Sequence, residues 1–484
     1  MSGSLPAVDP VIGGRDVPSR DRAVLTALDG TPLATVGLAP RLLAQAAFNR
    51  MRAADPAPAP VPELFAAAGE LFATAELAGE SPETYRRRVV LATGTPYGAI
   101  ARAVGNIGNS LGMIDRINRA ELPAPFAVPG CRTVWVPRGA LLAAVVPNNH
   151  PEPNVTWVRA LAMGARVLVR PGSKDPFTPR RLVTALLAAG LDPDTVAFLP
   201  GDHESGENLL ARADLGLVYG GPAAAARFGH RNDVLVRGPG RSKVLLGPGD
   251  QEDEELLDDL AGWISDDGGV RCNNISLVLT SGSVHDLAEA LAERLAALPV
   301  RPVTDERAAL PALGPEHGKA LADHAVGLAA AHGARDHSSH RYGGAPLADP
   351  GDGTVVLRPL VISVDRADAP PAGTELGFPF VVVAPWRPAD GVAPLRNSLV
   401  VGLPGEHAEL AGAVLREPTV RKVVTGRVRP WSGAPETPHD GSLAQFLLEP
   451  KGLITAETEP EPEPEPAYEP ESGTGTEPEP EPAA

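Results

Sequence analysis

The chain has 484 residues, which allows roughly two to four domains, each with its own core. Hydrophobic residues make up 43% and charged residues 21%, so most of the chain should fold as a globular protein. The net charge of -17 argues against a basic nucleic-acid surface, and no apolar run approaches the roughly 20 residues of a membrane-spanning helix. Two cysteines, Cys131 and Cys272, are too few for a disulfide framework or a four-thiolate metal site. These features predict a cytoplasmic, metal-free protein that neither binds nucleic acid nor spans a membrane.

The first part of the chain is expected to be helical after a flexible start. Residues 1–20 have little apolar periodicity, and we expect them to be frayed. Helical patterns follow in PVPELFAAAGELFATAELAG, SPETYRRRVVLATG and AIARAVGNIGNSLGMIDRINRAEL. From about residue 133, helical segments alternate with apolar runs rich in β-branched residues: TVWVP, ALLAAVVP, ARVLVRP, TVAFLPG, LGLVYGG and DVLVRGP. This alternation predicts a parallel sheet covered on both faces, with ligands at the carboxyl ends of its strands.

A second set of strands and helices begins after residue 242. Its strands are expected in KVLLG, ISLVLTSG, GTVVLRPLVISV, FPFVVVAPW, SLVVGLPG and RKVVTGRV. Its main helices are expected in EELLDDLAGWIS and VHDLAEALAERLAAL, so this part forms another α/β domain. Beyond it, residues 456–484 alternate Glu and Pro and hold ten of the negative charges, leaving -7 for the rest. Such a segment cannot bury surface, and we expect a disordered, solubilising tail.

Cys272 is a candidate nucleophile because of its place in SDDGGVRCNNISLVLTSG. Two glycines precede it and a predicted strand follows, so its thiol can be exposed beside backbone N–H groups that would hold a thiolate or an oxyanion. The alternative is a buried cysteine that acts as a small hydrophobe. The polar Asn273 and Asn274 that follow favour a site.

Asn149 is a second candidate, in AAVVPNNHPEPN. An apolar strand ends at Pro147, and a side-chain amide at the carboxyl end of a strand can donate a hydrogen bond to a developing oxyanion. The alternative is ordinary turn chemistry, which this segment by itself favours.

Six short motifs together carry a resemblance to a known family: PNNHP, VRPGSKDP, YGGPA, GPGRS, GGVRCNN and ELGFPF. Their order and approximate spacing, from about residue 80 to 445, resemble the aldehyde dehydrogenase superfamily. There the usual forms are PWNFP, KPAE, GST-x-x-G, ELGGK, GQ-x-C and E-x-FGP. Each match is loose; Val270, for example, stands where Gln is usual. The resemblance implies an α/β fold of the aldehyde dehydrogenase type, with two parallel-sheet domains and a small β oligomerisation flap.

The resemblance also implies how the chain is divided. The expected parts are a flexible N-terminus (1–20), a nicotinamide-cofactor domain (21–242) with a flap near 123–140, a catalytic domain (243–418), a C-terminal return and oligomerisation segment (419–455) and the disordered tail (456–484).

The resemblance assigns roles to individual residues. Cys272 aligns with the catalytic nucleophile, and Asn149 aligns with the amide that shares the oxyanion with the backbone N–H of the cysteine. Glu375 aligns with the residue that contacts the nicotinamide ribose. Gly220 and Gly221 open the turn on the pyrophosphate side.

Cofactor choice rests on the VRPGSKDP motif. Arg170 stands where the family has a ribose-binding Lys, and Ser173 and Lys174 stand where an acidic residue often holds the adenine ribose. A lysine there can pair with a 2′-phosphate, which favours NADP(H) over NAD(H), although a solvent-facing lysine is the alternative.

One departure from the family bears on the reaction. The general base, the Glu of ELGGK, aligns with Arg237, which keeps its proton and has no acceptor. We therefore expect no group near Cys272 that can activate water, and slow hydrolysis of a thioacyl enzyme. An acyl thioester avoids this need, because Cys272 expels a thiol and the acyl group is then reduced to an aldehyde. The leading hypothesis is therefore NAD(P)H-dependent reduction of an acyl-CoA or a carrier-bound acyl group.

A shorter resemblance lies near the C-terminal end. RKVVTGRVRPWSGAPETPHDG is similar to a segment of the acyl-CoA reductases of bacterial luminescence, with His439, Asp440 and Gly441 at its end. An ordinary structural loop is an equal alternative. If the segment is functional, His439 could titrate near neutral pH.

Two other functions stay open. One is an NAD(P)-dependent aldehyde dehydrogenase that uses some other base, and the other is a catalytically inactive partner protein. The family resemblance further implies a homodimer or homotetramer.

Overall fold

The computed structural model describes residues 5–55, 60–124, 127–247, 249–405 and 407–455. The expected tail at 456–484 lies outside these residues. The chain forms two compact units, which are Met1–Pro123 with Pro137–Glu449, and Ala124–Val136 with Pro450–Ala484.

The first sheet of the larger unit is mostly parallel, as the apolar runs predict. In spatial order its strands are β12 (Val234–Arg237), β11 (Leu215–Tyr219), β8 (Leu141–Val145), β9 (Arg166–Arg170), β10 (Val196–Phe198), β2 (Val11–Ile12) and β3 (Arg15–Asp16). The five strands from β12 to β10 pair in parallel, and β2 and β3 add an antiparallel edge. Strands β8 and β9 are almost entirely buried, which explains their continuous apolar sequences.

Among the residues that the structure describes, nine α-helices accompany this sheet, and α2 to α5 confirm the helical patterns of the first third. Their bounds are α1 (Arg41–Ala53), α2 (Pro62–Thr74), α3 (Pro82–Thr93), α4 (Tyr97–Gly112), α5 (Ile114–Ala120), α6 (Val155–Ala162), α7 (Phe177–Ala188), α8 (His203–Arg212) and α9 (Pro222–Phe228), with a short η1 (Glu152–Asn154). Large side chains from helices and strands form one core, including the fully buried Phe72, Tyr85 and Trp157. Burying such side chains stabilises the fold by roughly 1.5–3 kcal/mol each.

The N-terminal residues differ from the expectation. The prediction of a flexible segment over 1–20 is wrong for residues 5–20, because β2 extends the first sheet and Val11 is buried in its core. A small sheet follows with the order β1 (Ala7–Val8), β5 (Pro32–Gly37) and β4 (Arg22–Thr26). The two-residue strands β1, β2 and β3 carry too little periodicity to be recognised from the sequence.

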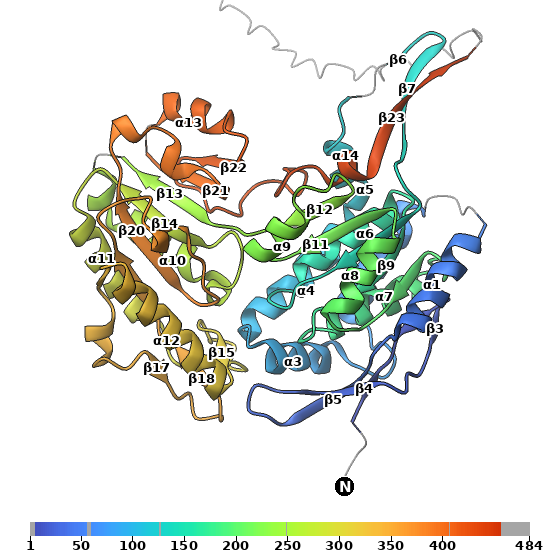
Figure 1. The fold of residues 1–484 in the computed structure, drawn as a ribbon, viewed down its shortest axis with the longest axis horizontal. Helices are drawn as coiled ribbons and strands as arrows, with labels where there is room; N and C mark the ends of the chain where they lie inside the picture. The colour runs from blue at the N-terminus through green and yellow to red at the C-terminus, as the bar shows by residue number, and fades with distance from the viewer. Residues whose placement is uncertain (1–4, 56–59, 125–126, 248, 406, 456–484) are drawn as a thin grey trace, which may run out of the picture. The chain divides into compact units, whose positions relative to one another are not determined.

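The second sheet has the order β16 (Arg335–Asp336), β19 (Leu360–Ser363), β20 (Phe380–Pro385), β14 (Ile275–Thr280), β13 (Ser242–Leu246), β21 (Ser398–Leu403) and β22 (Val420–Thr425). All its pairs are parallel except that of β16 with β19. Its helices are α10 (Glu254–Ser265), α11 (Val284–Ala296), α12 (Pro315–Ala331) and α13 (Ala408–Leu415). Figure 1 shows α10 and α11 beside β14 and β20, and α6 to α8 around β9 and β11.

Short elements complete the larger unit. A three-stranded sheet has the order β15 (Ala312–Leu313), β18 (Val355–Leu357) and β17 (Leu347–Ala348). The remaining helix α14 (Leu443–Leu447) contacts α5 and α6, so the chain returns from β22 to the helices of the first sheet. The 3₁₀ turns are η2 (Asp250–Glu252), η3 (Asp266–Gly269), η4 (Ser339–Tyr342), η5 (Pro370–Gly373), η6 (Pro388–Asp390) and η7 (Ala393–Leu395).

The smaller unit is built on a three-stranded sheet of β23 (Leu448–Ile454), β7 (Cys131–Pro137) and β6 (Ala127–Val128). In Figure 1 the red β23 lies beside the cyan β7, although the two strands are far apart in the sequence. Cys131 is exposed at the start of β7. Among the described residues, no helix is long and apolar enough to cross a membrane.

The carboxyl ends of the first sheet bring several polar residues to one edge. Arg170, Tyr219 and Arg237 are the last residues of β9, β11 and β12. The register pairs Tyr219 with Arg237, and Arg170 with the last residue of β8. Parallel strands place their carboxyl ends at the same edge, where open α/β sheets bind ligands.

Candidate active site

Cys272 lies in the loop between η3 and β14, and its side chain is exposed. Asn274 holds this loop, since it accepts a hydrogen bond from Arg271 N (2.8 Å) and donates to Trp263 O and Asp266 O (3.1 Å each). Gly269 has a φ of 70°, and a Cβ there would lie 2.6 Å from Pro379 N. Gly269 therefore adopts a left-handed conformation and lets the backbone of this loop approach that of Pro379 closely.

The backbone of Cys272 is held against the loop after β12. Ser242 donates its hydroxyl to Cys272 O at 3.0 Å, and a Cβ on Gly240 would lie 1.9 Å from the same oxygen. Glu375 also binds this loop, since its carboxylate accepts from Gly240 N (2.9 Å) and Arg241 N (2.6 Å). Three segments far apart in sequence therefore meet at the cysteine.

His439 lies beside the thiol. Its Nε2 atom is 3.8 Å from Cys272 Sγ. Burial, reinforced by the positive charge of Arg237, lowers the pKa of His439 to about 4 against the opposing effect of Asp440. The imidazole is therefore neutral at neutral pH, and whichever ring nitrogen lacks a proton is an acceptor.

The environment also keeps the thiol protonated. Although the side chain of Cys272 is exposed, the protein around it removes solvation from a thiolate and raises the pKa to about 12. The nearby carboxylates of Glu375 and Asp440 act in the same direction. The resting pair is therefore a neutral thiol and a neutral imidazole.

Asp440 connects this pair to Arg237, the residue at the position of the family's base. Asp440 Oδ2 is 3.6 Å from an Arg237 guanidinium nitrogen, and its other oxygen is 3.8 Å from Arg421 Nε. Arg237 is buried, and its Nε has no hydrogen-bond partner among the described residues. The guanidinium of Arg237 orients Asp440 and cannot act as a proton acceptor.

The structure therefore differs from one expectation. We predicted that no group near Cys272 could accept a proton, and the neutral ring of His439 is such a group. The prediction is wrong because it followed only the aligned position of Arg237, whereas the acceptor, His439, lies 167 residues after Cys272 in the chain.

Asn149 reaches the same loop. Its Nδ2 donates to Val270 O at 2.8 Å, while Thr95 holds the Asn149 carbonyl with a hydrogen bond of 3.1 Å. One N–H of this amide is used in the loop, and the second is left for a ligand. These contacts show a structural role of Asn149 in the turn, and the oxyanion role stays a prediction.

A cluster of charged side chains around Asp267 holds the loop of Cys272 in place. Asp267, at a φ of 52°, lies 3.2 Å from His150 and 3.0 Å from Arg271, and it also pairs with Arg102. Burial alone would raise the pKa of Asp267, but the hydrogen bond and charge of His150 and the two guanidinium groups lower it well below its usual range. Arg271 in turn lies over the ring of Trp431, 5.2 Å from its centroid. Trp431 belongs to the same C-terminal segment as His439, so this cluster ties that segment to the loop of Cys272.

The predicted cofactor residues lie at the edge of the first sheet. Arg170 is buried and donates its Nε to Gly201 O at 3.0 Å, and burial lowers its pKa. Ser173 and Lys174 are exposed. Gly220 and Gly221 form the turn between β11 and α9, with Gly220 N donating to Arg237 O at 3.1 Å. No hydrogen bond or ion pair joins these residues directly to Cys272 within the described part of the chain.

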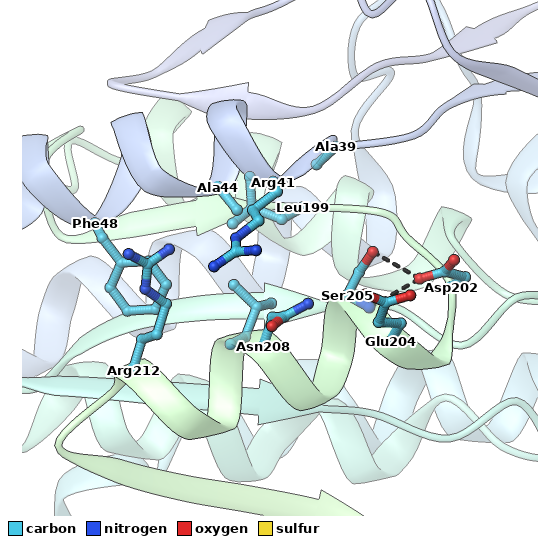
Figure 2. A pocket seen from close by; sticks show the side chains of 11 residues that line it. Ala39, Arg41, Ala44, Phe48, Leu199, Asp202, Glu204, Ser205, Asn208 and Arg212 are labelled. Atoms are coloured by element: carbon cyan, nitrogen blue, oxygen red, sulfur yellow. Dashed lines mark hydrogen bonds between the residues drawn. The ribbon is translucent and has the colours of Figure 1, made fainter.

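A cavity of about 190 Å³ lies elsewhere, between α1 and α8 (Figure 2). Its lining includes Arg41, Phe48, Asp202 and Arg212, and none of the predicted site residues. In Figure 2 the guanidinium of Arg212 lies over the Phe48 ring, and Asp202 is engaged with Ser205. This cavity therefore lies apart from the predicted site residues.

Comparison with known proteins identifies a family and a fold. The sequence model of the family described as "Aldehyde dehydrogenase family" matches residues 17–407. An N-succinylglutamate 5-semialdehyde dehydrogenase of Caulobacter sp. (strain K31) is 30% identical over 196 residues, which is 36% of this chain and 40% of that protein. A malonate-semialdehyde dehydrogenase of Geobacillus thermodenitrificans (strain NG80-2) is 26% identical over 46% of this chain and 48% of its own length. The chain thus spans less than half the length of these curated relatives.

Among solved structures, an indole-3-acetaldehyde dehydrogenase in complex with NAD⁺ superposes with a TM-score of 0.76. The match covers 94% of this chain and 98% of that one, at 18% sequence identity. This likeness concerns the fold.

Proposed function

The chain belongs to the aldehyde dehydrogenase family, and from this premise we propose that it oxidises an aldehyde to a carboxylic acid with NAD(P)⁺. Cys272 is the nucleophile in this proposal and His439 is the base. The observation that carries it is the 3.8 Å approach of His439 Nε2 to Cys272 Sγ. The semialdehyde activities of the two curated relatives support oxidation of an aldehyde, and they suggest a substrate that also bears a carboxylate.

In the first step, the sulfur attacks the aldehyde carbon while His439 takes the thiol proton. The pKa values of about 12 for Cys272 and about 4 for His439 disfavour a free thiolate–imidazolium pair. Proton transfer must therefore accompany formation of the sulfur–carbon bond, so that the negative charge forms on the substrate oxygen. The free N–H of Asn149 and the backbone N–H of Cys272 are the donors for that oxygen.

A bound nicotinamide, held by Arg170, Ser173, Lys174 and Glu375, would supply an acceptor for the hydride of the substrate carbon. Loss of that hydride would leave a thioester on Cys272. His439 then returns its proton to solvent and takes one from a water molecule, whose oxygen attacks the thioester. The sulfur leaves and regains a proton. Aldehyde, water and NAD(P)⁺ thereby yield acid, NAD(P)H and one proton.

The residues of the first sheet fit a nicotinamide cofactor. Arg170, Ser173 and Lys174 supply hydrogen-bond donors for ribose or phosphate oxygens, and a Cβ on Gly221 would meet only open space. Glu375 uses two of its roughly four lone-pair sites on backbone N–H groups and keeps the others for hydroxyl groups. The exposed Lys174 favours the 2′-phosphate of NADP(H), as the sequence suggests.

A second candidate function is the reduction of an acyl thioester to an aldehyde. Arg237 supports it, because this buried, protonated side chain occupies the position of the family's base. This reaction requires His439 only to move the thiol proton and needs no activated water. The link to the luminescence acyl-CoA reductases stays a prediction.

The test compares wild type with Cys272→Ala and His439→Gln in two assays, aldehyde with NAD(P)⁺ and acyl-CoA with NAD(P)H. We expect wild type to form acid, Cys272→Ala to form none, and His439→Gln to be slower by roughly 10²–10⁴-fold. Thioester reduction in wild type without acid formation would replace the first function by the second. An unchanged rate in His439→Gln would remove the assigned base.

We further propose a homodimer or homotetramer, through the sheet of β6, β7 and β23. Its strand β23 is largely exposed, and open strand edges are usually covered. Native mass spectrometry of the full chain tests this, and a monomer would contradict it. A cytoplasmic location stays a prediction.

A further inference from the structure

His285 and Glu289 lie four residues apart on α11, so their side chains share one face of the helix. His337 approaches this face from the loop after β16, and its side chain is fully buried. One potential ligand atom from each of the three residues lies within 4.8 Å of the other two. Two imidazoles and a carboxylate are a donor set that Zn²⁺ prefers.

His337 is held in position on both sides of its ring. Its Nδ1 lies 2.8 Å from Glu289 Oε1, and its Nε2 lies 2.8 Å from Ser363 Oγ on β19. Without a cation, Nδ1 donates its proton to Glu289 Oε1. With a cation between these two atoms, the ring would place its proton on Nε2, donate it to the serine hydroxyl and offer the Nδ1 lone pair to the ion. A hydrogen bond of this kind fixes the ring of a metal-binding histidine in other proteins.

Glu289 is oriented by a second partner. Arg341 donates to Glu289 Oε2 at 2.8 Å, which leaves Oε1 as the oxygen that faces His337. A carboxylate can bind a cation through one oxygen while a guanidinium holds the other.

His285 is the adjustable member of the set. It is exposed and makes no side-chain hydrogen bond to the described residues. Its ring contacts that of His337, with centroids 5.3 Å apart.

We propose that His285, Glu289 and His337 bind one Zn²⁺ ion, with the fourth position open to water. Bonds of about 2.0–2.1 Å in a tetrahedron place ligand atoms about 3.3 Å apart. The contact between His337 and Glu289 must therefore open by about 0.5 Å, and rotation of the exposed His285 closes the longer separations. The ion would join α11 to the loop that follows the edge strand β16 of the second sheet.

The test uses the full chain with Cys272 alkylated, so that the Cys272–His439 pair cannot bind zinc. The protein is dialysed against EDTA and then titrated with ZnSO₄ by calorimetry, and Co²⁺ serves as a spectroscopic probe. We expect one ion per chain, a visible absorption typical of tetrahedral Co²⁺, and a higher thermal midpoint with Zn²⁺. His285→Ala should weaken zinc binding at least about tenfold, and Ser363→Ala by roughly 10–100-fold.

His324→Ala is the matched control, because His324 is also an exposed helical histidine but lies on α12. It should bind zinc as wild type does. Since His285 is exposed, His285→Ala should keep the metal-free thermal midpoint, which separates lost binding from lost folding. Equal affinities in His285→Ala and His324→Ala, or no zinc uptake by wild type, would overturn the proposal and leave a His–Glu–Arg cluster that only supports the fold. These measurements do not depend on the enzymatic activity.

Discussion

At the scale of single residues, the proposed chemistry depends on the 3.8 Å contact between Cys272 Sγ and His439 Nε2. The pKa of the thiol is raised and that of the imidazole is lowered, so neither group is charged at rest. The reactivity of Cys272 should therefore come from proton transfer during attack. An enzyme with a preformed thiolate would behave differently toward small alkylating reagents.

Alkylation by iodoacetamide distinguishes the two cases. Because the pKa of Cys272 is about 12, we expect its alkylation rate to rise continuously from about pH 6 to about pH 10. Peptide mass spectrometry follows the reaction, with the exposed Cys131 as an internal reference. A plateau that begins below about pH 8 would reveal a stabilised thiolate and contradict this account.

Gly240 is a second residue on which the site depends. A Cβ at this position would lie 1.9 Å from Cys272 O and 2.7 Å from a Glu375 oxygen. Gly240→Ala should displace both loops, with loss of activity and a destabilisation of about 1–3 kcal/mol. Denaturant unfolding and the aldehyde assay measure the two effects.

Gly262→Ala is the control for this substitution, because its Cβ would meet no atom within 4 Å inside α10. It should keep its activity and gain up to about 1 kcal/mol of stability. If Gly240→Ala and Gly262→Ala had the same activity and stability, the close approach of Gly240 to Cys272 would not be required for either property.

At the scale of elements, the C-terminal segment after β22 places His439. Its helix α14 is held at the end of α5 by Glu121, which accepts from Ala444 N at 2.9 Å and pairs with Arg159 at 2.8 Å. Gln445 adds a hydrogen bond of 2.8 Å to Glu121 O. Since the pair of Glu121 and Arg159 is almost fully buried, it is sensitive to the loss of either partner.

Glu121→Ala should therefore cost about 3–5 kcal/mol, because it leaves the buried charge of Arg159 without a partner. The anchor of α14 is lost at the same time, so kcat should fall more than KM rises. Chemical denaturation and steady-state kinetics check the two effects. Glu121→Gln, which can still accept from Ala444 N, should retain more activity than the alanine variant, and the opposite ranking would exclude this anchoring role.

At the scale of the whole molecule, stability should depend on pH through buried groups. Asp175 accepts from Thr178 N (2.9 Å) and from its hydroxyl (2.6 Å), which in turn lies 2.8 Å from the Tyr85 hydroxyl. Burial raises the pKa of Asp175 from 3.8 to about 6. The folded protein therefore keeps a proton that the unfolded chain releases between these values.

The contribution of Asp175 to the free energy of unfolding is complete below about pH 4 and is lost as the pH rises through about 6. The two limits differ by about 3 kcal/mol. In Asp175→Asn the amide keeps hydrogen-bond partners on Thr178 and does not titrate. The free energy of unfolding of wild type relative to this variant should thus fall across that interval, as measured by urea unfolding at several pH values. A constant difference would mean that Asp175 titrates normally in the folded protein.

Much of the fold followed from local patterns. The alternation of buried strands with helices such as α7 and α11 predicted both parallel sheets, because periodicity depends only on neighbouring residues. The strands β1 to β3 were missed, since two-residue strands have no periodicity and acquire their structure from pairing with β5 and β10.

The sequence by itself determined the family and its candidate nucleophile, because order and spacing of motifs survive even when each motif is loose. Only the tertiary structure decided which group stands beside that nucleophile. The turn of Cys272 is specified by nearby glycines and Asn274, whereas the contact with His439 requires β22, α14 and Glu121 to bring a distant segment back to it. The proposed catalytic pair depends on packing between elements that are far apart in the sequence, and local sequence patterns do not predict such packing.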